Sequence, residues 1–166
     1  MESLNFLIRP LEKRDAGVVQ DVALASWRHT YQNIFPDSFI VQFIQQNYAP
    51  ERTESLVAML DSGRHHFVVA EVDSKVVGFC HLAKTDEGIQ LLRVYIRPSH
   101  MRLGIGRAFL QEADQYVRFH NYPYYFCYVH SQNEIGKAFY LKNNFVRQRQ
   151  KDVGDEQYLK KWVLDN

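Results

Sequence analysis

Cysteine is scarce in this sequence. The 166 residues include only Cys80 and Cys127, which form no CxxC pair and have no histidine at a metal-ligand spacing. Each lies in an apolar, strand-like run, so we expect two buried free thiols, no disulfide framework and no metal site. A large charge of either sign is also missing, because the formal net charge is +1. This gives no electrostatic argument for a nucleic acid or an anionic membrane as a partner.

Long hydrophobic runs are absent as well. No stretch approaches the roughly 20 apolar residues that a membrane span needs, and the first ten residues contain no apolar segment of signal-peptide length. We therefore expect a cytoplasmic protein. The sequence has no internal repeat, low-complexity segment or linker, so we expect residues 1–166 to form a single domain.

The sequence does contain a hydrophobic pattern whose period changes along the chain. Apolar residues recur at helical spacing from Asp15 to Gly63, and then follow the spacing of strands from Phe67 to Ile96. Asp73-Ser74 lies between two of these strand-like runs and predicts a tight hairpin. The pattern predicts helices at 15–31, 39–44, 51–63, 104–120 and 133–142, and strands at 7–10, 67–72, 75–82, 90–96, 124–129, 145–150 and 157–164.

This order of elements predicts an α/β (α+β) fold. The strands before residue 97 form an antiparallel meander, whereas residues 90–129 read as strand, helix, strand. Such a unit has a right-handed crossover and two parallel strands. We therefore expect one mixed, mostly antiparallel, twisted sheet that is flanked by helices and has a parallel strand–helix–strand unit at its centre.

The stretch from Leu92 to Arg107 contains a candidate phosphate-binding loop. It reads as a strand, a loop that begins at Pro98, the sequence Gly104-Ile105-Gly106 and a helix. Unpaired amides at a helix start, with glycines that let a phosphate approach the backbone, make a diphosphate cradle. A loop whose glycines only ease entry into a core helix is the alternative. The third glycine of a dinucleotide-binding fingerprint and the Gly-Lys-Ser/Thr of a P-loop are both missing.

A second block lies near the end of the chain. Asn133, Tyr140 and Phe145 follow the pattern Asn-x6-Tyr, then Phe. With Gly104-Ile105-Gly106, this block resembles the GNAT superfamily of N-acetyltransferases over nearly the whole chain. Met101 departs from the Arg or Gln that is usual three residues before the first glycine of the family motif. Residues 27–37 are similar to a common opening of the family, and residues 154–157 resemble members that acetylate polyamines.

The resemblance implies a transferase that uses acetyl-CoA as co-substrate, without a metal. The acceptor would be a primary amine of a small molecule, polyamine-like or other, or of a protein, and it would attack the thioester directly. The implied contacts of the coenzyme are Val94, Tyr95, Ile96, Met101, Arg102, Leu103, Gly104, Ile105, Gly106, Arg107, Asn133, Lys137 and Tyr140.

The resemblance also implies catalytic and acceptor-site residues. Tyr140 would be the acid that protonates the departing thiolate. The base is open, because many relatives place a glutamate on the strand where this chain has Gln90, and an amide cannot take a proton. Glu87, a water chain, or His81, which we otherwise expect to face solvent, are the candidates. The implied acceptor-site residues are Trp27, His29 and Tyr31.

Two other functions stay open. The first is a catalytically weak acyl-CoA-binding or regulatory module with the same fold, which Gln90 motivates. The second is a nucleotide-binding protein that uses the same cradle. The acceptor is open among polyamine, amino acid, aminoglycoside and protein amine, and so is the oligomeric state, with a homodimer as one option.

Overall fold

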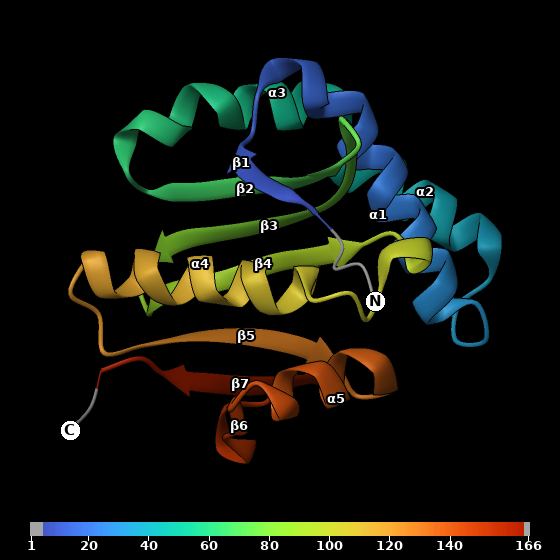
Figure 1. The fold of residues 1–166 in the computed structure, drawn as a ribbon. Coiled ribbons are helices and arrows are strands. Elements are labelled where there is room, and N and C mark those ends of the chain that lie inside the picture. The colour runs from blue at the N-terminus through green and yellow to red at the C-terminus, as the bar shows by residue number, and fades with distance from the viewer. Residues whose placement is uncertain (1–4, 165–166) are drawn as a thin grey trace.

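The computed structural model describes residues 5–164. These residues form a seven-stranded sheet with the order β1-β2-β3-β4-β5-β7-β6 (Figure 1). Neighbouring strands are antiparallel except β4 and β5, which are parallel. The strands are β1 (Leu7–Pro10), β2 (His65–Val72), β3 (Lys75–Thr85), β4 (Gly88–Ile96), β5 (Tyr124–His130), β6 (Val146–Arg147) and β7 (Glu156–Trp162).

Helices cover both faces of the sheet. One layer contains α1 (Ala16–Tyr31), α2 (Asp37–Asn47) and α3 (Pro50–Met59). The other contains α4 (Ile105–Phe119), which lies in front of β4 in Figure 1, and α5 (Glu134–Lys142), which lies near β6 and β7. Within the described range, no helix is both long and apolar enough to cross a membrane.

The sheet separates two hydrophobic cores. Because successive side chains of a strand point to opposite faces, β2 contributes Phe67 and Val69 to the core under α1–α3, and Val68 and Ala70 to the core under α4 and α5. Each core gathers apolar residues from several strands and buries them almost completely. The side chains of the central strands are therefore covered on both faces.

β4 changes direction at a β-bulge. In its pairing with β3, His81 lies opposite Arg93 and Leu82 opposite Leu91, so Leu92 is the extra residue. The parallel pairing of β4 with β5 ends just before this point, at Gln90 and Phe126. Because a bulge bends its strand and increases the local twist, the two strands separate beyond Gln90. Among the described strands, therefore, none pairs with the edge of β4 that faces β5 from the bulge to Ile96.

The predicted sheet with its central parallel unit is confirmed. The Asp73-Ser74 hairpin is also confirmed, because both residues have a positive φ (51° and 64°), as a type I′ turn requires. The strand predicted at 145–150 is shorter, since only Val146–Arg147 pair with β7. The chain then turns, because the Asp152 carboxylate accepts hydrogen bonds from the Arg147 side chain and the Tyr158 amide.

The prediction that His81 faces solvent is wrong. Only 2% of its surface is exposed, and its ring packs 4.8 Å from that of Phe67 between centroids. His65 Nδ1 lies 3.0 Å from His81 Nε2. An alternating strand pattern identifies two faces but not how many are covered, and β3 is covered on both.

Candidate active site

The loop that leads into α4 presents a run of free backbone amides. After β4, a short 3₁₀ turn (Pro98–His100) leads to Arg102 and Gly104, both left-handed, with φ of 63° and 91°. Across the described chain, no acceptor is present for the amide N–H of any residue from Arg102 to Arg107. These N–H groups lie at the positive end of the helix dipole, so the loop is built to bind an anion such as a diphosphate.

Two glycines shape this loop for different reasons. Gly104 has space around the position of a Cβ, so its left-handed φ is what favours glycine. At Gly106, by contrast, a Cβ would lie 2.9 Å from Cε2 of Phe139 on α5. Gly106 therefore allows α4 and α5 to pack closely beside the loop.

Most residues of the loop are exposed. Arg102, Leu103 and Arg107 are exposed, and Met101 is half-buried. Neither arginine forms an ion pair with the residues described here. Met101 replaces the usual Arg or Gln, and the neighbouring Arg102 supplies a positive charge at the same loop.

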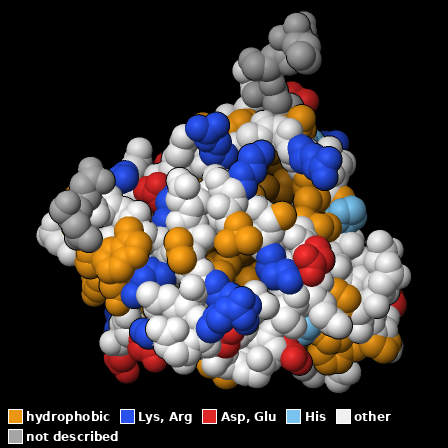
Figure 2. All heavy atoms as spheres, turned by 90° about the horizontal axis from the view of Figure 1, so that it is seen from below, with side chains coloured by type: hydrophobic (Ala, Val, Ile, Leu, Met, Phe, Trp, Pro, Cys, Tyr) orange, Lys and Arg blue, Asp and Glu red, His pale blue; other side chains and the backbone are white. Residues whose placement is uncertain are grey.

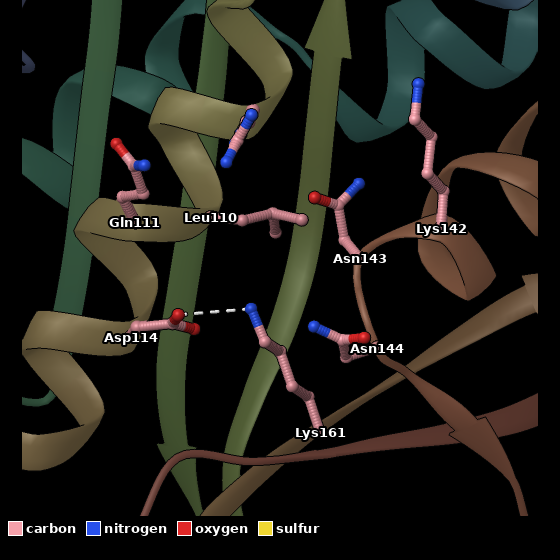
Figure 3. Close-up of a pocket in the computed structure, with 8 residues that line it drawn as sticks. Leu110, Gln111, Asp114, Lys142, Asn143, Asn144 and Lys161 are labelled. Carbon is pink, nitrogen blue, oxygen red and sulfur yellow. Dashed lines mark hydrogen bonds and ion pairs between the residues drawn. The ribbon is translucent and has the colours of Figure 1, made fainter.

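A pocket of about 390 Å³ adjoins the loop between α4, the end of α5 and β7 (Figure 3). Asp114 and Lys161 point toward each other across it, and Lys161 Nζ lies 3.1 Å from Asp114 Oδ2. Asp114 also accepts a hydrogen bond of 2.9 Å from the Tyr125 hydroxyl. The pocket is lined by Arg107, Leu110, Gln111, Asp114, Lys142, Asn143, Asn144 and Lys161.

The surface seen from below Figure 1 carries many positive charges. Figure 2 shows Lys and Arg side chains spread across this face, with hydrophobic side chains between them. The pocket has the same character, because its lining includes three cationic side chains and one carboxylate. A ligand that combines phosphates with apolar parts is complementary to such a surface.

Tyr140 lies on α5 in the core next to the separation of β4 and β5. It is 9% exposed, and its ring packs 5.1 Å from that of Phe145. Burial raises the pKa of its hydroxyl well above the ordinary value, with Cys127 and Tyr95 nearby. Among the residues described, none forms a hydrogen bond with this hydroxyl. Tyr140 therefore keeps its proton and has it available for a ligand.

Two hydrogen bonds attach the end of α1 to the rest of the site. The indole N–H of Trp27 donates to the Tyr95 hydroxyl on β4 at 3.0 Å. The Asn133 side-chain amide donates to the Tyr31 hydroxyl at 3.3 Å, and its oxygen accepts from the Gly136 amide at 2.8 Å. Asn133 is thus the N-cap of α5, and it connects this helix to α1. We call the opening between β4 and β5 beyond Gln90, beside Tyr31, Tyr95 and Asn133, the mouth of the site.

Four of the residues singled out from the sequence lie away from this mouth or are otherwise engaged. His29 is exposed and lies two positions from both Trp27 and Tyr31 on α1, hence on the other side of the helix. Glu87 is exposed on the turn that precedes β4, at the opposite end of the strand from Tyr95. Gln90 pairs with Phe126, and Lys137 forms an ion pair with Glu134 at 2.9 Å.

His81 has the wrong protonation properties for a base. Burial, together with the charges of Arg93, His65 and His66, lowers its pKa to about 3. A base with such a pKa is weak at neutral pH. Its ring also lies between Phe67 and His65, inside the core under α1–α3.

Two residues near the mouth were given no individual role by the sequence, although Glu156 lies within residues 154–157, which resemble members that acetylate polyamines. His130 ends β5, and its ring lies 6.1 Å from that of Tyr31 and 5.6 Å from that of Phe35. Glu156 begins β7 and pairs with His130. Burial raises the pKa of Tyr31 and the charge of Glu156 adds to this, so the two residues lie near each other although about 125 positions separate them. A local pattern contains no signal for that proximity.

Comparisons with known proteins agree with this geometry. Residues 63–147 match the sequence model of an acetyltransferase (GNAT) domain. A spermidine N(1)-acetyltransferase of Thermoplasma acidophilum is 32% identical over 139 residues, which are 83% of this chain and 86% of that protein.

Solved structures give the same result. The PaiA N-acetyltransferase from Thermoplasma acidophilum in complex with coenzyme A has a TM-score of 0.90 and 29% identity, and the match covers 96% of this chain and 99% of that one. A GNAT acetyltransferase from Staphylococcus aureus Mu50 has a TM-score of 0.73 at 16% identity, over 96% of this chain and 100% of that one, which shows a common fold. From the domain match and the sequence relative, the chain belongs to the GNAT family of acetyltransferases.

Proposed function

We propose that this protein transfers the acetyl group of acetyl-CoA to a primary amine by direct attack of the amine on the thioester. The observation that carries the proposal is the run of unpaired amides from Arg102 to Arg107 at the start of α4. A relative of 29% identity over 96% of the chain has a structure in complex with coenzyme A, which supports the same ligand here.

The coenzyme would extend from the α4 loop into the separation of β4 and β5. Its diphosphate would accept hydrogen bonds from the loop amides, with Arg102 and Arg107 adding positive charge. Its nucleotide end would occupy the pocket between α4 and α5, where Lys142 and Asn143 are available. The pantetheine arm would pair with the free edge of β4 from Val94 to Ile96, as an added strand does.

The chain's own residues would then assist transfer in three ways. Amides on the free edge of β4 would donate to the thioester carbonyl, where negative charge develops. Tyr140, which burial keeps protonated, would donate its proton to the departing sulfur. The helix layer of α1 and α2 would hold the amine at attack distance beside Tyr95 and Tyr31.

A water chain, rather than a side chain, would remove the proton from the amine. Gln90 cannot accept a proton, Glu87 lies at the far end of β4, and His81 is buried with a lowered pKa. A water chain from the mouth to solvent would meet the need, since an amine with a pKa of about 10 must lose a proton before it attacks. The sequence relative that acts on spermidine favours a polyamine-like acceptor.

The experiment incubates the protein with acetyl-CoA and each amine of a panel, and measures the release of the free CoA thiol. Coenzyme binding is measured separately by calorimetry. Transfer to at least one amine is the expected result. Coenzyme binding without any transfer would support the binding-module alternative, and stronger binding of ATP or NAD than of CoA would support a nucleotide-binding protein.

A further inference from the structure

Glu156 is a carboxylate near the end of α1 that has no Lys or Arg partner among the described residues. It is half-buried. By contrast, Asp37 at the start of α2 pairs with Arg28 at 2.9 Å. Removing a carboxylate partly from water is unfavourable unless an opposite charge or hydrogen bonds compensate it. A bound cation would therefore stabilise the Glu156 carboxylate.

The strand pairing places Glu156 on the acceptor side of the sheet. Leu159 and Val129 belong to the core under α4 and α5. Since side chains alternate along a strand, Glu156 and its partner His130 project from the opposite face. That is the face on which α1 lies, and the His130 ring contacts those of Tyr31 and Phe35 there.

The rings that contact His130, the strand partner of Glu156, add a second preference for a cation. Tyr31, Phe35 and His130 lie in ring contact with one another, at centroid distances of 5.4 to 6.1 Å. Aromatic faces attract ammonium groups, most strongly where water is partly excluded. His130 Nδ1 accepts the Gln132 amide N–H at 3.1 Å, so this ring nitrogen is already engaged within the protein.

An amine that attacks a thioester must be uncharged at the reacting nitrogen. A carboxylate held beside the mouth is therefore complementary to a second nitrogen of the acceptor, which keeps its proton during the reaction. Burial raises the pKa of Glu156, and the nearby His130 opposes this change.

We propose that Glu156, with Tyr31, Phe35 and His130, binds the non-reacting ammonium group of the acceptor and so selects diamines and polyamines over monoamines. This inference rests on the proposed function and specifies its acceptor. It makes Glu156 a determinant of specificity and leaves the proton transfers to other groups.

The test compares two acceptors of equal length, 1,4-diaminobutane and 1-aminobutane. For Glu156→Gln we expect kcat/KM for the diamine to fall roughly 10- to 100-fold, as for loss of a charged hydrogen bond, mainly through KM. The value for the monoamine should stay within about twofold. Glu156→Asp should recover part of the loss. Asp155→Asn, which removes the neighbouring exposed carboxylate, is the matched control and should leave kcat/KM for both amines unchanged.

An equal loss for both amines would overturn the inference, since it would indicate a structural or proton-transfer role, and so would no loss. If turnover of the monoamine is too slow to measure, titration of each amine into the CoA-saturated protein gives the same comparison, and equal diamine affinity of wild type and Glu156→Gln would refute the proposal. Failure of the proposed function is distinguishable, because it would appear in the wild type as absent CoA binding or absent transfer.

Discussion

The Trp27 indole N–H donates a hydrogen bond to the Tyr95 hydroxyl, and this contact joins α1 to β4 three residues beyond the bulge at Leu92. The Tyr95 ring also packs against Tyr48 and Phe79 at centroid distances of 6.0 and 5.5 Å. The strand edge proposed to hold the coenzyme and the helix proposed to hold the amine are thus fixed to each other by side chains of the same core.

This contact can be measured by a double-mutant cycle. Tyr95→Phe should lower the free energy of unfolding by about 1–2 kcal/mol, because it leaves the half-buried indole N–H without an acceptor. The coupling between Trp27→Phe and Tyr95→Phe should be about 1 kcal/mol. Urea unfolding of the wild type, the two single variants and the double variant provides the values. Strictly additive single effects would show that the hydrogen bond contributes nothing to stability.

Tyr140→Phe tests the proposed acid. The change removes only the hydroxyl, so the core packing with Phe145 should persist. If Tyr140 is the sole proton donor to the leaving sulfur, kcat should fall on the order of 10²–10⁴-fold while the affinity for CoA is nearly unchanged. Steady-state kinetics and calorimetry give the two quantities. An unchanged kcat would mean that another group or water protonates the sulfur.

The two loop glycines should respond differently to alanine. Gly104→Ala imposes a left-handed φ on alanine, at a cost of about 1 kcal/mol, without a new contact. Gly106→Ala places a methyl group against Phe139 and should cost about 1–3 kcal/mol. Combining Gly106→Ala with Phe139→Leu should recover part of that loss, whereas the same second change should not help Gly104→Ala. Thermal unfolding of the variants and CoA titration would reveal any departure from this pattern.

Because the pKa of His81 is lowered in the folded protein, we expect the protein to lose stability in acid. This pKa is about 3 in the folded protein, below the value of about 6.5 expected in the unfolded chain. The unfolded state therefore binds the proton more tightly, and the free energy of unfolding decreases as pH falls from about 6.5 toward 3. The contribution lost by about pH 4.5 is on the order of 2 kcal/mol. His65 and His66, whose pKa values burial also lowers, act in the same direction.

Urea unfolding at several pH values provides the check. The slope of stability against pH between about 6.5 and 4.5 should be smaller in His81→Gln than in the wild type. His29→Gln, which removes an exposed histidine on α1, is the control and should leave the slope as it is. Equal slopes in the wild type and His81→Gln would exclude His81 as the source of acid sensitivity.

The parts of the fold and site that sequence reasoning predicted are the local ones. Gly104 and the helix after it form one continuous segment, and Asn133 and Tyr140 are seven residues apart across one helix, so their spacing determines their geometry. The bulge at Leu92 was not predictable in the same way. It depends on how β4 pairs with β3, and an apolar run gives no register.

Residues brought together from distant segments were also missed. Glu156 and His130 meet Tyr31 only because β7 pairs with β5 next to the end of α1. His81 was assigned to the wrong environment for a related reason. Periodicity separates the two faces of a strand, but the helix layer that covers the second face is encoded far away, in the first 62 residues.

The two cores on opposite faces of one sheet have a consequence for how such a protein can change. The domain match begins at residue 63, after the three helices that cover the α1 side. Because each strand residue belongs to one core, substitutions among those helices can be accommodated without altering the packing of α4 behind its loop. If the proposed function holds, acceptor specificity can therefore change during evolution while the coenzyme site stays the same. The sheet separates the helices that would bind the amine from the loop that would bind the coenzyme.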